Sequence, residues 1–189
     1  MRVWPTALIA AIWVSWFVFW RFAARAGKPV EQQESIVSRL AYLLPMFMVI
    51  ALVMWQDWPG WLGTRLYDGN WTEYWISVAV LVFGLVLAVW ARSQLGDNWS
   101  GRVTVRTGHE LVRSGPYRSI RHPIYTGGLL GLLGTALASG KLSGFLGVLL
   151  ALCALLYKLR IEERVMSAQF GDTYREYRRV SWALVPFLY

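Results

Sequence analysis

Long apolar runs, each about as long as the hydrocarbon core of a bilayer is thick, restrict the fold of this sequence more than any other feature. A helix that crosses a membrane needs about 20 mostly apolar residues. Such runs occupy residues 3–20, 36–55 and 74–91, and a longer block covers 123–157. Because this block is too long for one helix and is broken at Ser139-Gly140-Lys141, we expect two helices joined by a tight turn. The sequence therefore predicts an all-α integral membrane protein with about five transmembrane helices, the last two forming a tight helical hairpin.

The composition supports this prediction. Of the 189 residues, 56% are hydrophobic and only 16% are charged, whereas about a quarter of the residues in a typical soluble domain are charged. The 12 tryptophans are typical of proteins that meet the bilayer–water interface. Soluble, disordered and collagen-like classes are excluded, because one core of this size could not hide so much apolar surface from water.

The formal net charge of +8 is explained by membrane topology. When the segments between the predicted helices are assigned to alternate sides, one side carries 16 basic residues and the other carries three. The positive-inside rule then predicts that the N-terminus lies outside and that the C-terminus and both strongly basic segments lie in the cytoplasm. Nucleic acid is not an expected partner.

The predicted helices divide the chain into two parts. Residues 1–91 hold three N-terminal transmembrane helices. Residues 92–189 hold a cytoplasmic segment, the helical hairpin 123–157 and a cytoplasmic tail. Because the hairpin starts and ends at the same membrane face, it brings the segment and the tail together. His122 precedes Pro123, which suits the first position of a helix, and we expect unpaired amides there that could bind an anionic group.

The residues alone indicate a cytoplasm-facing pocket without naming its chemistry. A lone histidine at an interface, such as His122, is more often a capping residue than a catalyst. Glu163, in the Glu162-Glu163 pair, could simply neutralise nearby arginines. Two histidines without a carboxylate at matched spacing make a weak metal site, so no metal is expected.

Five fragments in the C-terminal half, in this order and spacing, resemble the isoprenylcysteine carboxyl methyltransferases. They are His109-Glu110-Leu111-Val112, Gly115-Pro116-Tyr117, Arg121-His122-Pro123-x-Tyr125-x-Gly127, Glu162-Glu163 and Phe170-Gly171-x-x-Tyr174-x-x-Tyr177. The same terminal core occurs in phospholipid methyltransferases and, more distantly, in membrane sterol reductases. The resemblance covers about residues 92–186. It implies a helical membrane enzyme that binds S-adenosyl-L-methionine on the cytoplasmic side and methylates a lipid-borne group.

The resemblance also assigns roles to residues. The cofactor-binding positions that it implies are His109, Glu110, Leu111, Val112, Tyr117, His122, Pro123, Ile124, Tyr125 and Glu162. The substrate-contacting arginine of the family, four residues before the glutamate, is replaced here by Lys158, and Arg160 is close by in the sequence. Catalytic work by Glu162, Lys158 and Arg160 would consist of positioning rather than acid–base chemistry.

The resemblance predicts methylation of the C-terminal carboxylate of an isoprenylcysteine, and a lysine in place of the arginine leaves the acceptor open. Alternatives within the same chemistry are a lipid amine and a small thiol. Other classes are a membrane reductase that uses a nicotinamide cofactor and a non-enzymatic scaffold whose arginines bind anionic lipid. The expected partners are a lipophilic methyl acceptor, prenylated or not, and membrane lipids; the oligomeric state stays open.

Overall fold

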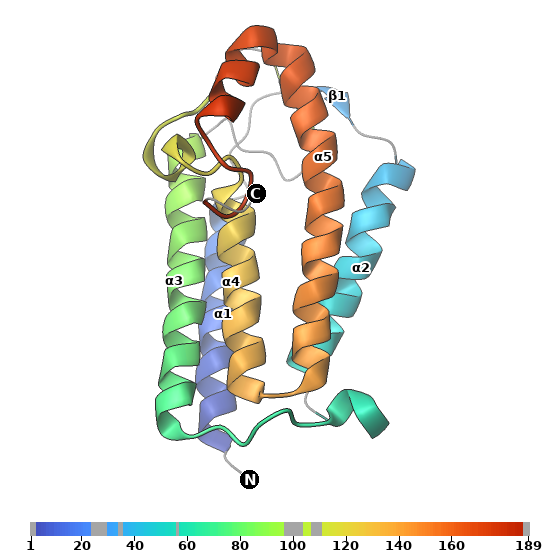
Figure 1. Cartoon of the computed structure of the whole chain (residues 1–189), viewed down its shortest axis with the longest axis vertical. Coiled ribbons are helices and arrows are strands. Elements are labelled where there is room, and N and C mark those ends of the chain that lie inside the picture. The colour runs from blue at the N-terminus through green and yellow to red at the C-terminus, as the bar shows by residue number, and fades with distance from the viewer. Residues whose placement is uncertain are drawn as a thin grey trace.

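The computed structural model describes residues 3–23, 30–33, 36–55, 57–96, 104–106 and 111–186, and within them the fold is a bundle of helices that run side by side (Figure 1). The α-helices are α1 (Val3–Ala23), α2 (Ile36–Met54), α3 (Trp71–Leu95), α4 (Pro123–Ser139) and α5 (Leu142–Arg179). The shorter elements are the antiparallel strands β1 (Val30–Gln33) and β2 (Thr104–Arg106) and the 3-10 helices η1 (Gly60–Gly63) and η3 (Gly115–Arg118). The predicted all-α class is confirmed, as is the hairpin of α4 and α5.

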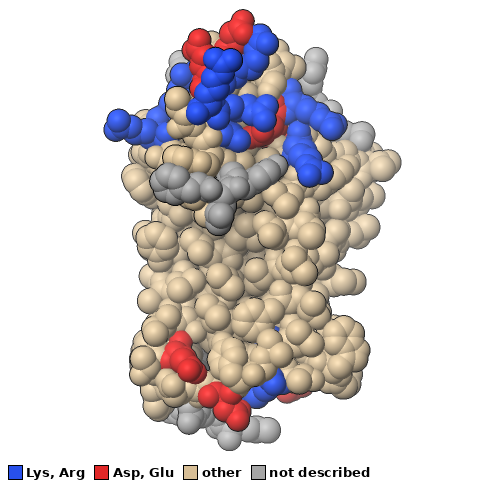
Figure 2. Space-filling model, in the orientation of Figure 1, with Lys and Arg blue, Asp and Glu red and all other residues tan. Residues whose placement is uncertain are grey.

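Helix lengths fit a protein that crosses the membrane several times. Four helices (α1, α2, α3 and α5) are long and apolar enough to span a bilayer, and α4 is an apolar helix of 17 residues. Figure 2 shows a broad uncharged belt, with Lys and Arg gathered at one end of the molecule. Large apolar side chains such as Phe17, Phe47 and Phe83 are more than half exposed on the outer helices, where lipid would cover them.

The observed helices extend past several predicted ends. Helix α3 begins three residues early because the Asn70 side chain accepts from the Glu73 amide at 3.0 Å, and the Glu73 carboxylate accepts from the Asn70 amide at 3.1 Å. Helix α5 has 38 residues, which corresponds to about 57 Å at 1.5 Å per residue. Its second half therefore projects beyond the apolar belt, and its path changes at Gly171, where φ is 53°.

The two helices α3 and α4 approach so closely that their backbones touch. A Cβ atom added to Gly84 would lie 2.6 Å from the carbonyl oxygen of Gly127, and one added to Gly134 would lie 2.5 Å from the amide nitrogen of Leu81. Small residues permit this approach, which replaces the hydrophobic driving force that is missing between helices in lipid. The contact fixes the position of the first residues of α4 along the length of α3.

A single buried cluster joins the two predicted parts of the chain. It contains side chains from α1 through α3 and from α4 and α5: Trp13, Val49, Val53, Leu81, Leu85, Leu132 and Ala151. The division between residues 91 and 92 therefore separates two segments that share one core. That residues 92–189 alone form the functional part of the chain stays a prediction.

We expect Gly127→Ala to destabilise the bundle and Gly128→Ala to be tolerated. A Cβ atom on Gly127 would collide with the carbonyl oxygen of Gly84, whereas one on Gly128 would meet no atom within 4 Å. Overpacking of this kind costs about 1–3 kcal/mol. The measurement is the apparent thermal unfolding temperature of each variant in detergent, and equal temperatures for the two variants would contradict the close contact.

Candidate functional site

The site is built at the basic end of the bundle, where η3 leads into α4. Gly115 adopts a φ of 56°, which starts the 3-10 turn, and Pro116 and Tyr117 within it are buried. The phenol of Tyr177, on α5 beyond Gly171, donates a hydrogen bond to the Tyr117 carbonyl. The turn is thereby attached to the far end of α5.

His122 caps α4, and Pro123 occupies the first helical position as predicted. The His122 carbonyl accepts from the amides of Tyr125 at 3.0 Å and Thr126 at 3.1 Å. The sequence suggested free amides at this helix start. The amides of His122, Tyr125 and Thr126 are instead hydrogen-bonded, and Pro123 has no N–H to offer. An anion site made of helix amides is not supported.

The tail after α5 folds back over the start of α4. Backbone hydrogen bonds join Arg121 N–H to the Trp182 carbonyl at 2.8 Å and His122 N–H to the Ala183 carbonyl at 3.0 Å. The Thr126 hydroxyl donates to the Leu184 carbonyl at 2.7 Å. Sequence reasoning missed this return, since the tail carries no periodic pattern that would reveal strand-like pairing.

The half-buried carboxylate of Glu162 lies at the centre of the site. The Tyr125 hydroxyl donates a hydrogen bond to it, His122 Nδ1 lies 3.3 Å from Glu162 Oε2, and Lys158 Nζ lies 3.8 Å from Glu162 Oε1. The side chains of His122, Lys158 and Glu162 are between 10% and 18% exposed. We call these four residues the Glu162 cluster.

Aromatic rings surround the cations of the cluster. The His122 and Tyr125 rings are parallel within 2° at a centroid separation of 5.6 Å. Lys158 Nζ lies 4.9 Å from the ring centroid of Tyr42 and 5.3 Å from that of Tyr125, both within the range of a cation–π interaction. Tyr42 is a buried residue of α2 that the sequence analysis missed, because nothing in the local sequence links it to a helix more than 100 residues later.

Glu163 faces a different set of partners from Glu162. It accepts a hydrogen bond from Arg121 Nε at 2.6 Å, and Arg178 Nε lies 3.4 Å from its second oxygen. The neutralising role suggested for Glu163 is therefore observed. His122 Nε2 lies 3.6 Å from Glu163, beyond hydrogen-bond distance, and is buried without a hydrogen-bond partner.

Electrostatics favour a protonated His122. Burial lowers the pKa of this imidazole, but the hydrogen bond to Glu162 and the nearby charges of Glu162 and Glu163 outweigh it and raise the pKa above its ordinary value. Among the described residues, no group of three or more His, Cys, Asp or Glu side chains is arranged to hold a metal ion.

The structure brings together only part of the predicted set. His122, Tyr125, Lys158 and Glu162 meet in one cluster, and Tyr117 is buried. Arg160 is exposed on α5. Leu111, Val112 and Ile124 are half-buried and Pro123 is buried, whereas His109 and Glu110 lie outside the described residues.

The cluster can bind a flat, polar group. The charge of Glu162 is already balanced by His122 and Lys158, so this carboxylate offers a hydrogen-bond acceptor rather than net negative charge. The parallel rings offer a stacking face, and the unpaired imidazole nitrogen offers a polar contact. These residues fit the adenosine part of S-adenosyl-L-methionine.

Comparison with known proteins agrees with this chemistry. A family model described as phospholipid methyltransferase matches residues 72–173, more than half of the chain. Methanethiol S-methyltransferase 2 of Bradyrhizobium diazoefficiens is 29% identical over 163 residues, covering 80% of this chain and 61% of that protein. Protein-S-isoprenylcysteine O-methyltransferase of Dictyostelium discoideum is 24% identical over 160 residues, covering 79% of this chain and 66% of that protein.

A solved structure shares the fold. The eukaryotic intramembrane Ras methyltransferase ICMT (isoprenylcysteine carboxyl methyltransferase) aligns with a TM-score of 0.58 at 23% identity, over 80% of this chain and 52% of that one. The chain thus spans between 52% and 66% of the length of these three relatives.

The raised pKa of His122 predicts a loss of stability at alkaline pH. The stabilisation is complete below the unfolded-state pKa of about 6.5 and is lost as pH rises through the higher folded-state pKa. The apparent unfolding temperature in detergent should therefore fall with rising pH above neutrality for the wild type, and much less for His122→Gln. Tyr125→Phe removes a bond to Glu162 without removing the imidazole, so it should keep the slope; parallel slopes for wild type and His122→Gln would contradict the assignment.

Proposed function

Because the chain belongs to the phospholipid methyltransferase family, we propose that it is a membrane methyltransferase that uses S-adenosyl-L-methionine and methylates a lipophilic acceptor. Membership of a methyltransferase family implies a methyl donor. The observation that carries the proposal is the Glu162 cluster, because it unites His122 and Tyr125 with Lys158 and Glu162 across two segments of the chain. On this proposal residues 92–189 form the methyltransferase core, and residues 1–91 contribute Tyr42 and membrane anchoring.

The cofactor supplies a methyl group that is already activated on a positively charged sulfur. We assign to Glu162 the binding of polar groups of the cofactor, since His122 and Lys158 already balance its charge, and to His122 and Tyr125 the stacking face. Tyr117 is buried in η3, five residues before His122. Because these groups are largely buried, they exclude water and hold their partners in fixed positions, which is what an in-line displacement needs.

A carboxylate acceptor suits this site best. It is ionised at neutral pH and needs no base, and the carboxylates of Glu162 and Glu163 are both engaged by hydroxyl or cationic partners. Lys158 is the cation positioned to orient it, because the Arg160 side chain is exposed and lies outside the Glu162 cluster. An amine acceptor would have to lose a proton before attack, so it would need a base.

A small thiol is the second candidate acceptor. One relative is named methanethiol S-methyltransferase 2, and an ammonium such as that of Lys158 favours the thiolate form of a nearby thiol. Neither acceptor requires a group beyond those already in the Glu162 cluster.

The distribution of charge supports a cytoplasmic site. The basic end of the molecule (Figure 2) carries the start of α4, the second half of α5 and the tail, and the positive-inside rule places such an end in the cytoplasm. We propose that the N-terminus lies on the opposite side.

Calorimetric titration of the detergent-purified protein tests the cofactor. We expect saturable binding of S-adenosyl-L-methionine and S-adenosylhomocysteine by the wild type and at least about tenfold weaker binding by Glu162→Gln, since a hydrogen bond to a charged group contributes about 1.5–3 kcal/mol. Glu176→Gln, on the exposed surface of the same helix, should bind normally. Binding of a reduced nicotinamide in place of both ligands would support the reductase and overturn the proposal.

Cysteine labelling tests the orientation. Cys153 is the one cysteine of the chain, so Cys153→Ser gives a background for single exposed cysteines at Asp57 and Arg164, which lie at opposite ends of the bundle. A membrane-impermeant maleimide should label Asp57→Cys on intact cells and Arg164→Cys only after permeabilisation. The reverse pattern would contradict the proposed orientation.

A further inference from the structure

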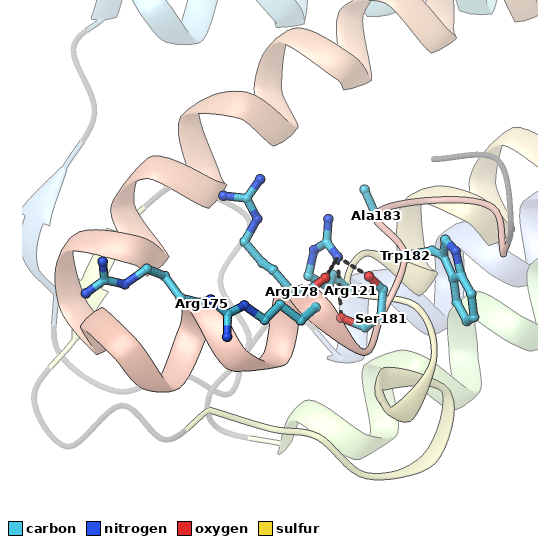
Figure 3. Close-up of a pocket in the computed structure, with 7 residues that line it drawn as sticks. Arg121, Arg175, Arg178, Ser181, Trp182 and Ala183 are labelled. Atoms are coloured by element: carbon cyan, nitrogen blue, oxygen red, sulfur yellow. Dashed lines mark hydrogen bonds between the residues drawn. The ribbon is translucent and has the colours of Figure 1, made fainter.

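A pocket rich in arginine lies beside the returning tail, outside the Glu162 cluster. It has a volume of about 380 Å³ and is lined by Arg121, Arg175, Arg178, Arg179, Ser181 and Trp182, among others. Figure 3 shows that Arg175 and Arg178 extend from α5, whereas Ser181 and Trp182 come from the tail. We call it the arginine pocket.

The positive charge of the arginine pocket is only partly neutralised. Glu163 is shared by Arg121 and Arg178. Asp172 pairs with Arg175, but their side chains are 84% and 67% exposed, so water screens this pair. Within the part of the chain that the structure describes, Arg179 has no carboxylate partner. Among the described residues, these four guanidinium groups share ion pairs with only two carboxylates, Glu163 and Asp172, so an anion would be attracted.

Apolar side chains flank the same segment. Val180 and Val185, next to the lining residues in the tail, are 70% and 42% exposed. Trp182 lies between them in the sequence, and tryptophan favours the bilayer–water interface. The tail also rests on the first turn of α4, where the apolar helices begin. A pocket at the level of this first turn would lie between the phosphate groups and the acyl chains of the membrane lipids.

We propose that the arginine pocket binds the phosphate of an anionic phospholipid from the leaflet at this end of the bundle. Arg175 and Arg179 supply the charge, since Arg121 and Arg178 are held by Glu163. Val180 and Val185 contact the acyl chains. This lipid site does not depend on the methyl acceptor or on the cofactor.

Native mass spectrometry of the 189-residue chain in detergent tests the site with phosphatidylglycerol and with phosphatidylcholine of the same acyl chains. We expect the wild type to retain phosphatidylglycerol preferentially. The double variant Arg175→Gln/Arg179→Gln should lose at least about tenfold in apparent affinity, because each basic residue near an anionic surface contributes about a factor of five. The matched control is Arg118→Gln/Arg164→Gln, which removes two exposed arginines outside the pocket and should retain the lipid.

Two further measurements separate the alternatives. Val180→Ser/Val185→Ser should weaken retention of phosphatidylglycerol while leaving every arginine in place, which also covers the case in which the double arginine variant does not fold. Inorganic phosphate should not displace the lipid. Equal retention by the pocket variant and its control would overturn the proposal, and so would displacement by inorganic phosphate, which would make the pocket a site for the free ion.

Discussion

The site depends on the nearly buried ion pair between Arg121 and Glu163, whose side chains are 9% and 11% exposed. Removing one partner of such a pair leaves an uncompensated charge and costs about 3–5 kcal/mol. Arg121 also donates to the Ser181 carbonyl, so the pair ties the start of α4, the projecting part of α5 and the tail to one another. His122 follows Arg121 directly, and its position in the Glu162 cluster is a consequence of this junction.

The packing of α3 against α4 fixes where the start of α4, with Arg121 and His122 just before it, lies along the bundle axis. Lipid is as apolar as the helix surfaces, so association relies on close van der Waals contact, which the backbone approach of Gly84 and Gly127 provides. The Ser114 hydroxyl lies 3.1 Å from the Gln94 side-chain oxygen near the end of α3, so η3 is placed by the same helix. The glycines matter to the site through this placement, although they do not touch it.

Apolar runs in the sequence predicted where all five α-helices lie, because a segment that crosses the hydrocarbon core needs about 20 apolar residues. The part of α5 beyond the apolar belt has no such run and is not predicted by this rule. The end of α3 was harder to predict: Arg92 reads as the start of a polar loop, yet it is 5% exposed inside the helix and donates to the carbonyls of Gly96 and Ala23. In the site, Lys158 and Glu162 are one helical turn apart and so share a face. The contact of Lys158 with Tyr42 and the return of the tail over α4 arise from tertiary packing, which leaves no local pattern.

Glu162 and Glu163 are neighbours in the sequence but point about 100° apart around α5, since the helix has 3.6 residues per turn. One carboxylate therefore serves the Glu162 cluster and the other serves the arginines. His122 lies between them, with Nδ1 3.3 Å from Glu162 and Nε2 3.6 Å from Glu163. An anion bound in the arginine pocket and a proton on His122 would therefore both interact with the charge of one carboxylate, Glu163. The tail, which folds over the start of α4 and lines the arginine pocket, thus influences the charge balance around His122.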